Sequence, residues 1–375
     1  MLTNWGTISN SIKKLKKGKL KKEKLDQSSI ELKMGKTIAQ SRLSRLYDEN
    51  LKKYLSQQTM GAFNPAAQNV EIGDFEMTGR GLKAKKRFEI DDVILEIPIA
   101  PCTVNIQKVL EDSMIKRFFS SVWPKNVTYD NMDFYILFYH IHRKKAKQDK
   151  SPFNAYFDSL PIWYDVPNVW DDKHINLLSK YDGHILREEI EIIEKRYRKI
   201  KDLIDTTGFY LDLDYESYMW CYNSIRTRSF ATNWIDLHEG GFQLPDYVIK
   251  YEKDDEKVYN TRLHRHIIMV PFMDMANHSN LLDNADVELS YNCTSWQMIA
   301  TKPIKYGEEI FLNYDPDPTN MVLINYGFVE KISNPYEKII LSTTEVEPSP
   351  IKYVRLENTD LSFTSTKLML RDGEA

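Results

Sequence analysis

The spacing of apolar residues predicts strands near both ends of the chain and helices between them. Residues 70–77 alternate between apolar and polar side chains, and residues 93–98 form a short apolar run. Between them, a turn at Gly79-Arg80-Gly81 leads into a strand that starts at residues 82–84. After residue 107 the apolar residues recur at helical spacing among many Lys and Glu residues. Helices are predicted over residues 110–119, 130–147, 174–203 and 215–228.

Strand-like patterns return after residue 262. Strands are predicted over residues 267–271, 287–291, 297–301, 309–313 and 339–342. Residues 320–326 predict a helix that ends at Gly327, because Gly commonly follows the last turn of a helix. Strands from both ends of the chain around a helical middle indicate an α+β fold whose sheet is interrupted by a long helical insert.

These patterns divide the chain into five segments. They are a basic, partly disordered segment (1–60), the first part of the β-rich fold (61–106), the helical insert and a polar loop (107–262), the second part of the β-rich fold (263–335), and a short remnant or the start of a C-terminal lobe (336–375). Apolar residues between Ile38 and Leu55 recur at roughly helical spacing, which is compatible with a docked amphipathic helix. We nevertheless expect residues 1–60 to contribute little to the folded core.

The composition is typical of a soluble globular protein, with 42% hydrophobic and 28% charged residues. No apolar run approaches the roughly 20 residues that a membrane helix needs, and the N-terminus has no apolar signal-peptide core. Cys102, Cys221 and Cys293 lie far apart, and no CxxC pair supports a disulfide framework or a cysteine-rich zinc site. Because unpaired thiols suit a reducing compartment, we expect a protein of the cytosol or nucleus.

The charge is unevenly distributed along the chain. The first 60 residues carry 14 Lys and Arg against 5 Asp and Glu, whereas the remainder carries 37 against 49. The acidic remainder is unlike a nucleic-acid-binding domain, so nucleic acid would be contacted only through the basic segment. The basic cluster from Lys13 to Lys24 is compatible with a nuclear-localisation signal, an electrostatic tether, or a solvated and partly helical tail.

Four short motifs, taken in chain order, carry the candidate chemistry. They are residues 79–84 (GRGLKA), 226–230 (RTRSF), 274–279 (DMANHS) and 307–314 (GEEIFLNY), the last followed by Tyr326-Gly327-Phe328. Each is weak alone, since glycine turns are common and none here joins a strand to a helix as in dinucleotide-binding folds. Asp274 and His278 have the i, i+4 spacing of a helical metal site, but without a third ligand a structural hydrogen bond is commoner. We therefore expect no metal.

Together and in this order, the motifs resemble the SET domain, in particular the branch of the Rubisco large-subunit lysine methyltransferase and the actin-histidine methyltransferase. The resemblance covers roughly residues 70–342, and the stretch from Leu160-Pro161 to Trp170 is similar to a proline-containing segment of that branch. It implies a SET-domain β-fold with a pseudoknot, interrupted by the insert. It also implies S-adenosyl-L-methionine as cofactor and a protein, not a membrane, as partner.

The resemblance further implies which residues contact the cofactor. They are Gly81, Leu82 and Lys83 through their backbone at the methionine part, Arg228 at the carboxylate, Asn277 and His278 at the amino group and adenine, Phe328 on the adenine, and Tyr314 at the transferring methyl. Tyr314 would be the catalytic residue. The substrate channel would be lined by Phe230, Asp274 and Tyr326.

These residue types suit the implied reaction, a methyl transfer to a lysine side-chain nitrogen. The main demand of such a transfer is positioning, and aromatic walls suit the stem and charged head of a lysine. A lysine has a pKa near 10.4 in water, and a dry channel favours the neutral amine that reacts. A histidine target and a non-catalytic SET-like scaffold are the alternatives.

Two departures from the family pattern affect the loop after the catalytic block and the C-terminus. The family's Tyr-Gly step is Tyr314-Asp315 here, followed by Pro316 and Pro318, so we expect a loop of different shape. The segment after Glu337 is shorter than the family's C-terminal lobe. Either this lobe is truncated, or the insert and the basic segment recognise the substrate.

Overall fold

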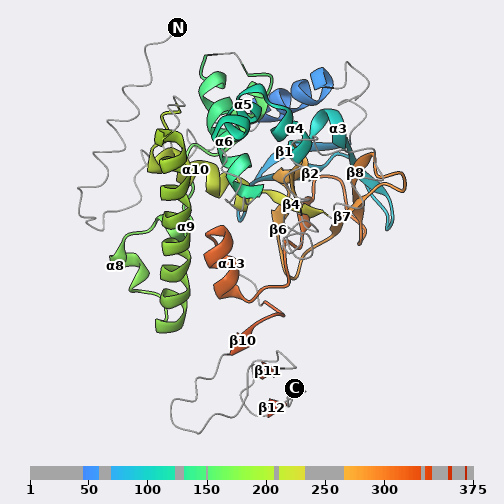
Figure 1. Ribbon diagram of the computed structural model, residues 1–375. Coiled ribbons are helices and arrows are strands. Elements are labelled where there is room, and N and C mark those ends of the chain that lie inside the picture. The colour runs from blue at the N-terminus through green and yellow to red at the C-terminus, as the bar shows by residue number, and fades with distance from the viewer. Residues whose placement is uncertain are drawn as a thin grey trace, which may run out of the picture. The chain divides into compact units, whose positions relative to one another are not determined.

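The structure is a computed structural model that describes residues 45–58, 69–122, 131–148, 151–206, 211–232, 266–330, 334–339, 354–356 and 368–369 (Figure 1). These residues belong to one compact unit, Ser44–Ala375. The strands come mainly from its two ends and the helices mainly from its middle, which confirms the predicted α+β architecture with a helical insert. Of the helices described, none is long and apolar enough to cross a membrane.

One four-stranded sheet joins the two ends of the β-rich fold. Its strands follow the order β1 (Val70–Phe75), β2 (Gly79–Ala84), β9 (Glu309–Leu312) and β6 (Asn277–His278). All pairs are antiparallel except β6 with β9, which run parallel. Three of the four motifs therefore lie on adjacent strands of this sheet, although up to about 230 residues separate them in sequence.

The remaining strands form three smaller sheets. Their orders are β3 (Val93–Pro98), β8 (Ser295–Ala300) and β7 (Ala285–Leu289); β4 (Ser229–Thr232) and β5 (His266–Met269); and β10 (Lys338–Ile339), β11 (Val354–Leu356) and β12 (Leu368–Met369). The strands predicted in the two β-rich parts are confirmed to within a few residues. The strand predicted over residues 339–342 starts in β10, and its last three residues lie outside the described part of the chain.

The first predicted turn is displaced by three residues. The turn occupies residues 76–78, and β2 already begins at Gly79. Gly79 has a φ of +76°, a left-handed conformation that Gly adopts without steric cost. Gly81 lies within the strand and is required there for a different reason, because two side chains of the site approach it closely. Prediction from the sequence treated both glycines as turn residues and was wrong for Gly81.

The insert is helical, as predicted, but two of its helices are interrupted. Its elements are α4 (Ile106–Glu111), α5 (Ser113–Val122), α6 (Asn131–Ala146), α7 (Asn154–Ser159), the 3-10 turn η2 (Pro167–Val169), α8 (Asp172–Ile175), α9 (Lys180–Thr206) and α10 (Tyr215–Arg226). Asp112 accepts hydrogen bonds from the backbone N–H groups of Met114 and Ile115 and so starts α5. Ser179 accepts from the N–H of Asp182 at the start of α9. The predicted polar loop over residues 235–262 lies outside the described part.

Helix α6 anchors the insert to the β-rich fold. Residues 133–142 of this helix are all buried, so it has no solvent-facing side there and packs against α7, α10 and β5. A helix buried on all sides shows little amphipathic periodicity. The hydroxyl of Tyr135 donates a hydrogen bond of 2.5 Å to the carbonyl oxygen of Ile267 in β5. The insert and the sheet therefore share one hydrophobic core.

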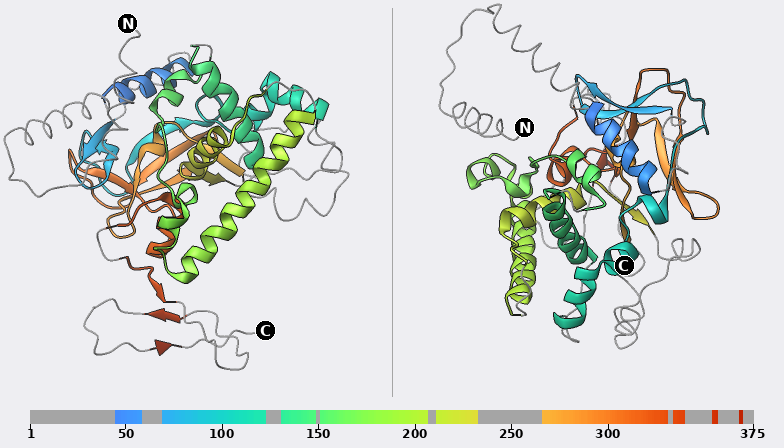
Figure 2. Two further views of the ribbon diagram at one scale, coloured as in Figure 1. Left: turned by 90° about the vertical axis from the view of Figure 1, so that its left-hand side faces the viewer. Right: turned by 90° about the horizontal axis from the view of Figure 1, so that it is seen from above.

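A helix over residues 45–58 packs into the same core, beside the strands of the first sheet (Figure 2). Leu51, Tyr54 and Leu55 are completely buried. The hydroxyl of Tyr54 donates to the carbonyl oxygen of Cys102 at 3.1 Å, and Asp48 accepts from the N–H of Ile72 in β1 at 3.0 Å. The expected amphipathic helix is confirmed, and the prediction that residues 1–60 contribute little to the core is wrong for this stretch. Residues 1–44 lie outside the described part.

We predict that Leu51→Ala lowers the free energy of unfolding by about 2–5 kcal/mol, because it leaves a cavity in the core. Leu46 lies on the same helix with half of its surface exposed (50%), so Leu46→Ala is a matched control that should change stability by less than about 0.5 kcal/mol. Urea denaturation followed by circular dichroism measures both. Equal stability of the two variants would show that the helix does not belong to the core.

Candidate active site

Three pockets follow one another along the four-stranded sheet, and the middle one is also lined by the insert. The apolar pocket, about 490 Å³, is lined by Phe75, Glu76, Met77, Thr78, Asn277, His278, Ser279, Leu282, Glu309, Phe311, Phe328, Val329 and Glu330. The arginine pocket, about 230 Å³, is lined by Arg80, Pro161, Trp163, Tyr164, Asp165, Val166, Thr227, Arg228, Asp274, Met275, Asn277, Tyr314, Tyr326 and Phe328. The aromatic pocket, about 280 Å³, is lined by Thr227, Arg228, Ser229, Phe230, Ala231, Asp274, Ala276, Asp286, Val287, Trp296, Leu312, Asn313, Tyr314, Asp315 and Tyr326.

Shared walls show the order of these pockets. Asn277 and Phe328 line both the apolar and the arginine pocket. Arg228, Asp274 and Tyr314 line both the arginine and the aromatic pocket, as do Thr227 and Tyr326. The apolar and aromatic pockets share no residue. The arginine pocket therefore lies between the other two, and Tyr314 lies at its boundary with the aromatic pocket.

Tyr314 is held in place by hydrogen bonds at both ends. Its hydroxyl donates to the carbonyl oxygen of Ala276 at 2.6 Å, and its backbone N–H donates to Nδ1 of His278 at 2.9 Å. Its ring lies 5.0 Å from the ring of Tyr326 and 5.1 Å from that of His278. Burial raises the pKa of the Tyr314 hydroxyl above its ordinary value, so this hydroxyl is neutral at physiological pH.

His278 is a neutral imidazole with its proton on Nε2. Its Nδ1 accepts the hydrogen bond from Tyr314 and therefore carries no proton. Nε2 is buried without a hydrogen-bond partner, and the nearest carboxylate oxygen, on Glu330, lies 3.7 Å away. Burial lowers the pKa of His278 below its usual range and outweighs the opposing effect of Glu330. The unpartnered Nε2–H is available to a ligand of the apolar pocket.

Arg228 and Asp274 form a buried pair between the arginine and aromatic pockets. The guanidinium of Arg228 donates to the Asp274 carbonyl oxygen at 3.0 Å and lies 3.6 Å from its carboxylate. The Tyr156 hydroxyl, from the insert, donates to the same carboxylate at 3.0 Å. Nε of Arg228 and Oδ1 of Asp274 are buried without partners. Burial raises the pKa of Asp274, although Arg228 and Tyr156 oppose this effect.

Asp274 and His278 do not lie on one helix, so their i, i+4 spacing does not place them on one helical face. Asp274 belongs to the 3-10 turn η3 (Met273–Met275) and contacts the insert, whereas His278 belongs to β6. Within the described residues, no group of three His, Cys, Asp or Glu side chains could hold a metal ion.

Asn277 connects the apolar and arginine pockets to the glycine motif. Its Nδ2 donates to the carbonyl oxygen of Arg80 at 3.1 Å and to Oε1 of Glu309 at 2.8 Å. Thr78 donates to the same carboxylate at 2.7 Å. A Cβ on Gly81 would lie only 2.5 Å from Oε1 of Glu309 and 2.6 Å from Nδ2 of Asn277, so a larger residue would displace these two hydrogen-bonded side chains. Burial raises the pKa of Glu309, and the two hydrogen bonds partly offset this.

Most of the residues expected from the motifs lie together. Arg228, Asn277, His278, Tyr314 and Phe328 line the series of pockets, and Phe230, Asp274 and Tyr326 line the aromatic pocket. Gly81 lines none of them but lies against Glu309 and Asn277, which do. Leu82 and Lys83 do not line any of the three. The side chain of Leu82 is completely buried, and Lys83 forms an ion pair with Glu71 at 2.5 Å.

Sequence reasoning missed many residues of the pocket walls, among them Arg80, Glu309, Trp163 and Tyr164. Arg80 and Glu309 stand inside motifs that were recognised, but the resemblance attached no role to their side chains. Trp163 and Tyr164 come from the proline-containing segment of the insert. The signal for Arg80 was its place between two glycines, next to the expected cofactor backbone contacts. No signal in the sequence places Trp163 at a pocket.

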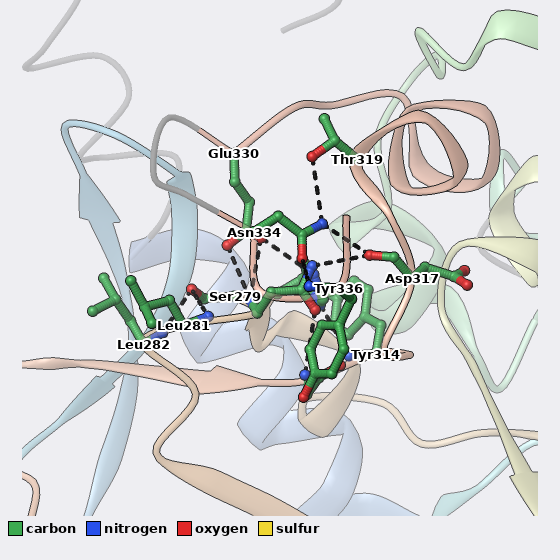
Figure 3. A network of polar contacts seen from close by, with 12 residues as sticks. Ser279, Leu281, Leu282, Tyr314, Asp317, Thr319, Glu330, Asn334 and Tyr336 are labelled. Carbon is green, nitrogen blue, oxygen red and sulfur yellow. Dashed lines mark hydrogen bonds and ion pairs between the residues drawn. The ribbon is translucent and has the colours of Figure 1, made fainter. Parts of the chain in front are cut away.

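The segment after α13 (Thr319–Tyr326) passes beside β6 and is tied there by polar contacts (Figure 3). The N–H of Asn280 donates to the Glu330 carboxylate at 3.0 Å, and Asn334 donates to the carbonyl oxygen of Asp317 at 2.9 Å. Gly327, at φ +82°, ends α13, and a Cβ there would clash with the Asp165 carbonyl oxygen. This contact with the insert fixes the direction of Phe328.

Comparison with known proteins agrees with this geometry. The family model described as the SET domain matches residues 79–315. The chain belongs to the SET-domain family. The match begins at the glycine motif and ends directly after Tyr314, so this SET domain includes the insert. Tyr326 and Phe328, which complete the pocket walls, lie just beyond it.

Relatives of this SET domain include both named enzymes and solved structures. N-lysine methyltransferase SETD6 from Homo sapiens is 32% identical, over 79% of this chain and 57% of its own length. SET domain-containing protein 4 from Artemia parthenogenetica is 21% identical, over 68% of this chain and 56% of its own. The crystal structure of the SET domain of LSMT bound to lysine and AdoHcy has a TM-score of 0.55 at 19% identity, over 80% of this chain and 61% of that one. The chain thus spans a little over half the length of these curated relatives.

We predict that the burial of His278 makes the stability of this SET domain sensitive to acid. Because the folded pKa of His278 lies below the unfolded value near 6.5, the unfolded chain binds the proton first as the pH falls. The free energy of unfolding then decreases below about pH 6.5. The variant His278→Asn keeps an acceptor for the Tyr314 N–H but cannot titrate.

Urea denaturation of both proteins between pH 8 and pH 5 tests this prediction. All other titrating groups are common to the two, so the stability of the variant relative to the wild type should rise as the pH falls. If the difference in unfolding free energy between variant and wild type does not change with pH, the neutral state of the His278 imidazole is contradicted.

Proposed function

We propose that this SET domain transfers a methyl group from S-adenosyl-L-methionine to the side-chain nitrogen of a lysine on another protein. The observation that carries the proposal is the position of Tyr314 at the boundary between two pockets. In a methyl transfer the nucleophile and the leaving group lie on opposite sides of one carbon, and their alignment provides much of the rate. Two pockets that meet at a fixed hydroxyl suit such a reaction.

The apolar and arginine pockets suit the cofactor. Phe328 offers an aromatic face 5.8 Å from the ring of His278, and the buried Nε2–H of His278 and Nε–H of Arg228 are unpartnered donors. Buried donors without partners are costly, so a ligand that accepts from them is favoured. When bound, S-adenosyl-L-methionine supplies a methyl group on a positively charged sulfur. Phe328 and His278 would hold its adenosine, and Arg228 its carboxylate.

Tyr314 is the proposed catalytic residue because of how its hydroxyl is oriented. The hydroxyl proton is committed to the carbonyl oxygen of Ala276, so the oxygen lone pairs remain available as acceptors at the pocket boundary. A polarised methyl group is a weak C–H donor to such an oxygen. Because the hydroxyl is already oriented, it needs no reorganisation during the reaction.

The aromatic pocket suits a lysine side chain. Phe230 lies 6.0 Å from Trp296, and Tyr326 lies 5.0 Å from Tyr314, so aromatic faces are available to the aliphatic stem. Burial and the nearby Asp315 and Asp317 raise the pKa of Tyr326 to about 12, which keeps its hydroxyl neutral. The same desolvation disfavours the ammonium form of an entering lysine, and Oδ1 of Asp274 is an acceptor without a partner.

The relatives support lysine as the acceptor. SETD6 is named as an N-lysine methyltransferase, and the SET domain of LSMT was solved with lysine bound. The alternative, a histidine acceptor, is supported by the actin-histidine N-methyltransferase of Gallus gallus. That protein is 23% identical over 77% of this chain and 44% of its own length. We also propose that the protein acts in the cytosol or nucleus, supported by the free thiols of Cys102 and Cys221. Fluorescence microscopy of the tagged chain tests that point.

A methyl-transfer assay with radiolabelled S-adenosyl-L-methionine and a protein extract tests the proposed activity. We expect label on protein, mapped to lysine residues by mass spectrometry. Label mapped to histidine would overturn lysine as the acceptor, but the proposed methyltransferase activity would stand. If no protein is labelled and calorimetry detects no binding of S-adenosyl-L-methionine, the proposed activity is overturned in favour of a non-catalytic SET-like scaffold.

We predict that Tyr314→Phe keeps the fold and most cofactor affinity but lowers the single-turnover rate by about 10²–10³-fold, since one preorganised polar group at a reacting centre is worth that much. Stability should fall by only about 1 kcal/mol, the net contribution of one hydrogen bond. Tyr306, with 75% of its surface exposed, provides the control variant Tyr306→Phe, which should match the wild type in rate and melting temperature. A rate for Tyr314→Phe close to that of the wild type would move the assignment to Tyr326.

A further inference from the structure

The charged residues at the aromatic pocket are mostly acidic. Asp274, Asp286 and Asp315 line it, and Arg228 is the one cation among the described residues that do so. Arg228 lies 3.6 Å from the Asp274 carboxylate, and these two charges therefore largely offset each other. Asp286 and Asp315 leave the pocket with a net negative charge.

Asp286 and Asp315 are both exposed and form an acidic rim at this pocket. Asp286 lies in the edge strand β7, and its carboxylate accepts a hydrogen bond from the backbone N–H of Val287 at 2.7 Å. Asp315 directly follows Tyr314, and its carbonyl oxygen accepts from the N–H of Asp317 at 2.7 Å in a tight turn. The two carboxylates thus reach the rim from two different sheets of the fold.

A buried polar atom in the same pocket indicates that a ligand enters it. Oδ1 of Asp274 has no hydrogen-bond partner, and the side chain of Asp274 is completely buried. A buried acceptor of this kind is costly unless a bound group supplies a donor. The interior of the pocket therefore suits a donor group, and whatever adjoins that group in the ligand lies at the acidic rim.

The negative charge of the acidic rim extends into the pocket wall. Burial raises the pKa of the Tyr326 hydroxyl to about 12, and Asp315 contributes to this rise. Arg226 opposes it, but its guanidinium is paired with the carboxylate of Glu189 and so contributes little positive charge to the rim. A cation next to the entering group is therefore attracted, and an anion is repelled.

We propose that the acidic rim selects target lysines whose neighbours in the substrate chain are Lys or Arg. The proposal rests on the proposed function, because it requires the target lysine to enter the aromatic pocket. Consecutive Cα atoms lie about 3.8 Å apart, so the neighbours of a bound lysine are held near the pocket opening. The long side chains of Lys and Arg can reach a rim carboxylate while their charged ends stay in water. Asp315 stands where the family pattern has Gly, so the preference is a property of this chain.

The sites labelled in a protein extract with radiolabelled S-adenosyl-L-methionine test the preference. We expect Lys and Arg beside the labelled residues to be at least about twofold more frequent than beside all lysines of that extract. One labelled protein is then remade with these neighbours changed to Gln. Its kcat/KM should fall by about threefold to tenfold, as expected for exposed ion pairs, and mainly through KM. The fall should shrink in about 1 M salt, where exposed charges are screened.

Variants of the acidic rim assign the preference to its two carboxylates. The readout is the ratio of kcat/KM between the native and the Gln-flanked substrate, so a general loss of activity cancels. Asp286→Asn combined with Asp315→Asn should bring this ratio to within about twofold of one, because no rim charge remains. Glu288→Gln, exposed on the same strand and outside the three pockets, should keep the ratio of the wild type. Thermal melts report folding, and if the double variant does not fold, each single variant should lower the ratio.

The outcomes distinguish the role of the acidic rim from the proposed function. If the wild type labels no protein, the proposed function fails and the selection by the rim fails with it. If proteins are labelled without an excess of Lys and Arg beside the sites, only the selection is overturned and the methyltransferase activity stands. The same holds if the rim variants keep the ratio of the wild type, or if Glu288→Gln lowers it as much as they do.

Discussion

The parallel pairing of β6 with β9 is the constraint on which the site depends. It places Asn277 opposite Phe311 and His278 opposite Leu312, while the other side of β9 pairs with β2. The glycine motif, the Asn-His motif and the block before Tyr314 therefore become neighbours on one sheet. The hydrogen bonds from Asn277 to Glu309 and to the Arg80 carbonyl oxygen lock this arrangement on the pocket side. Without the pairing, Tyr314 would lose the His278 acceptor that fixes its backbone.

The insert completes the site with groups that the sheet does not provide. Tyr156 donates to the Asp274 carboxylate, Ser159 accepts from Arg80, and the Asp165 carbonyl oxygen lies against Gly327. A buried ion pair such as Arg228 with Asp274 contributes little net stability, because both charges lose their hydration. Its unpartnered atoms indicate that this polar cluster serves ligand binding more than folding.

The sequence predicted the fold class, the order of strands and insert, and a set of residues most of which lie together at the pockets, because these follow from periodicity and from motifs in a characteristic order. It failed where the outcome depends on contacts between distant segments. The role of Gly81 is set by Glu309 and Asn277, more than 190 residues away. The helix over residues 45–58 lies in a basic stretch, and only the burial of Leu51, Tyr54 and Leu55 shows that it belongs to the core. Arg80 looked like a turn residue because its partners, Tyr47 and Ser159, cannot be identified from local sequence.

The long sequence separation within the four-stranded sheet has a consequence for synthesis of the protein. The contact of Thr78 with Glu309 joins residues 231 positions apart, so β2 must wait for β9 until nearly the whole SET domain has left the ribosome. Until then one edge of β2 is unpaired, and open strand edges promote association with other chains. Folding that depends on such non-local pairing is slow. The nascent chain therefore exposes this edge of β2 until β9 is made, and the pockets that β6 and β9 help to line are complete only after the last strand has joined the sheet.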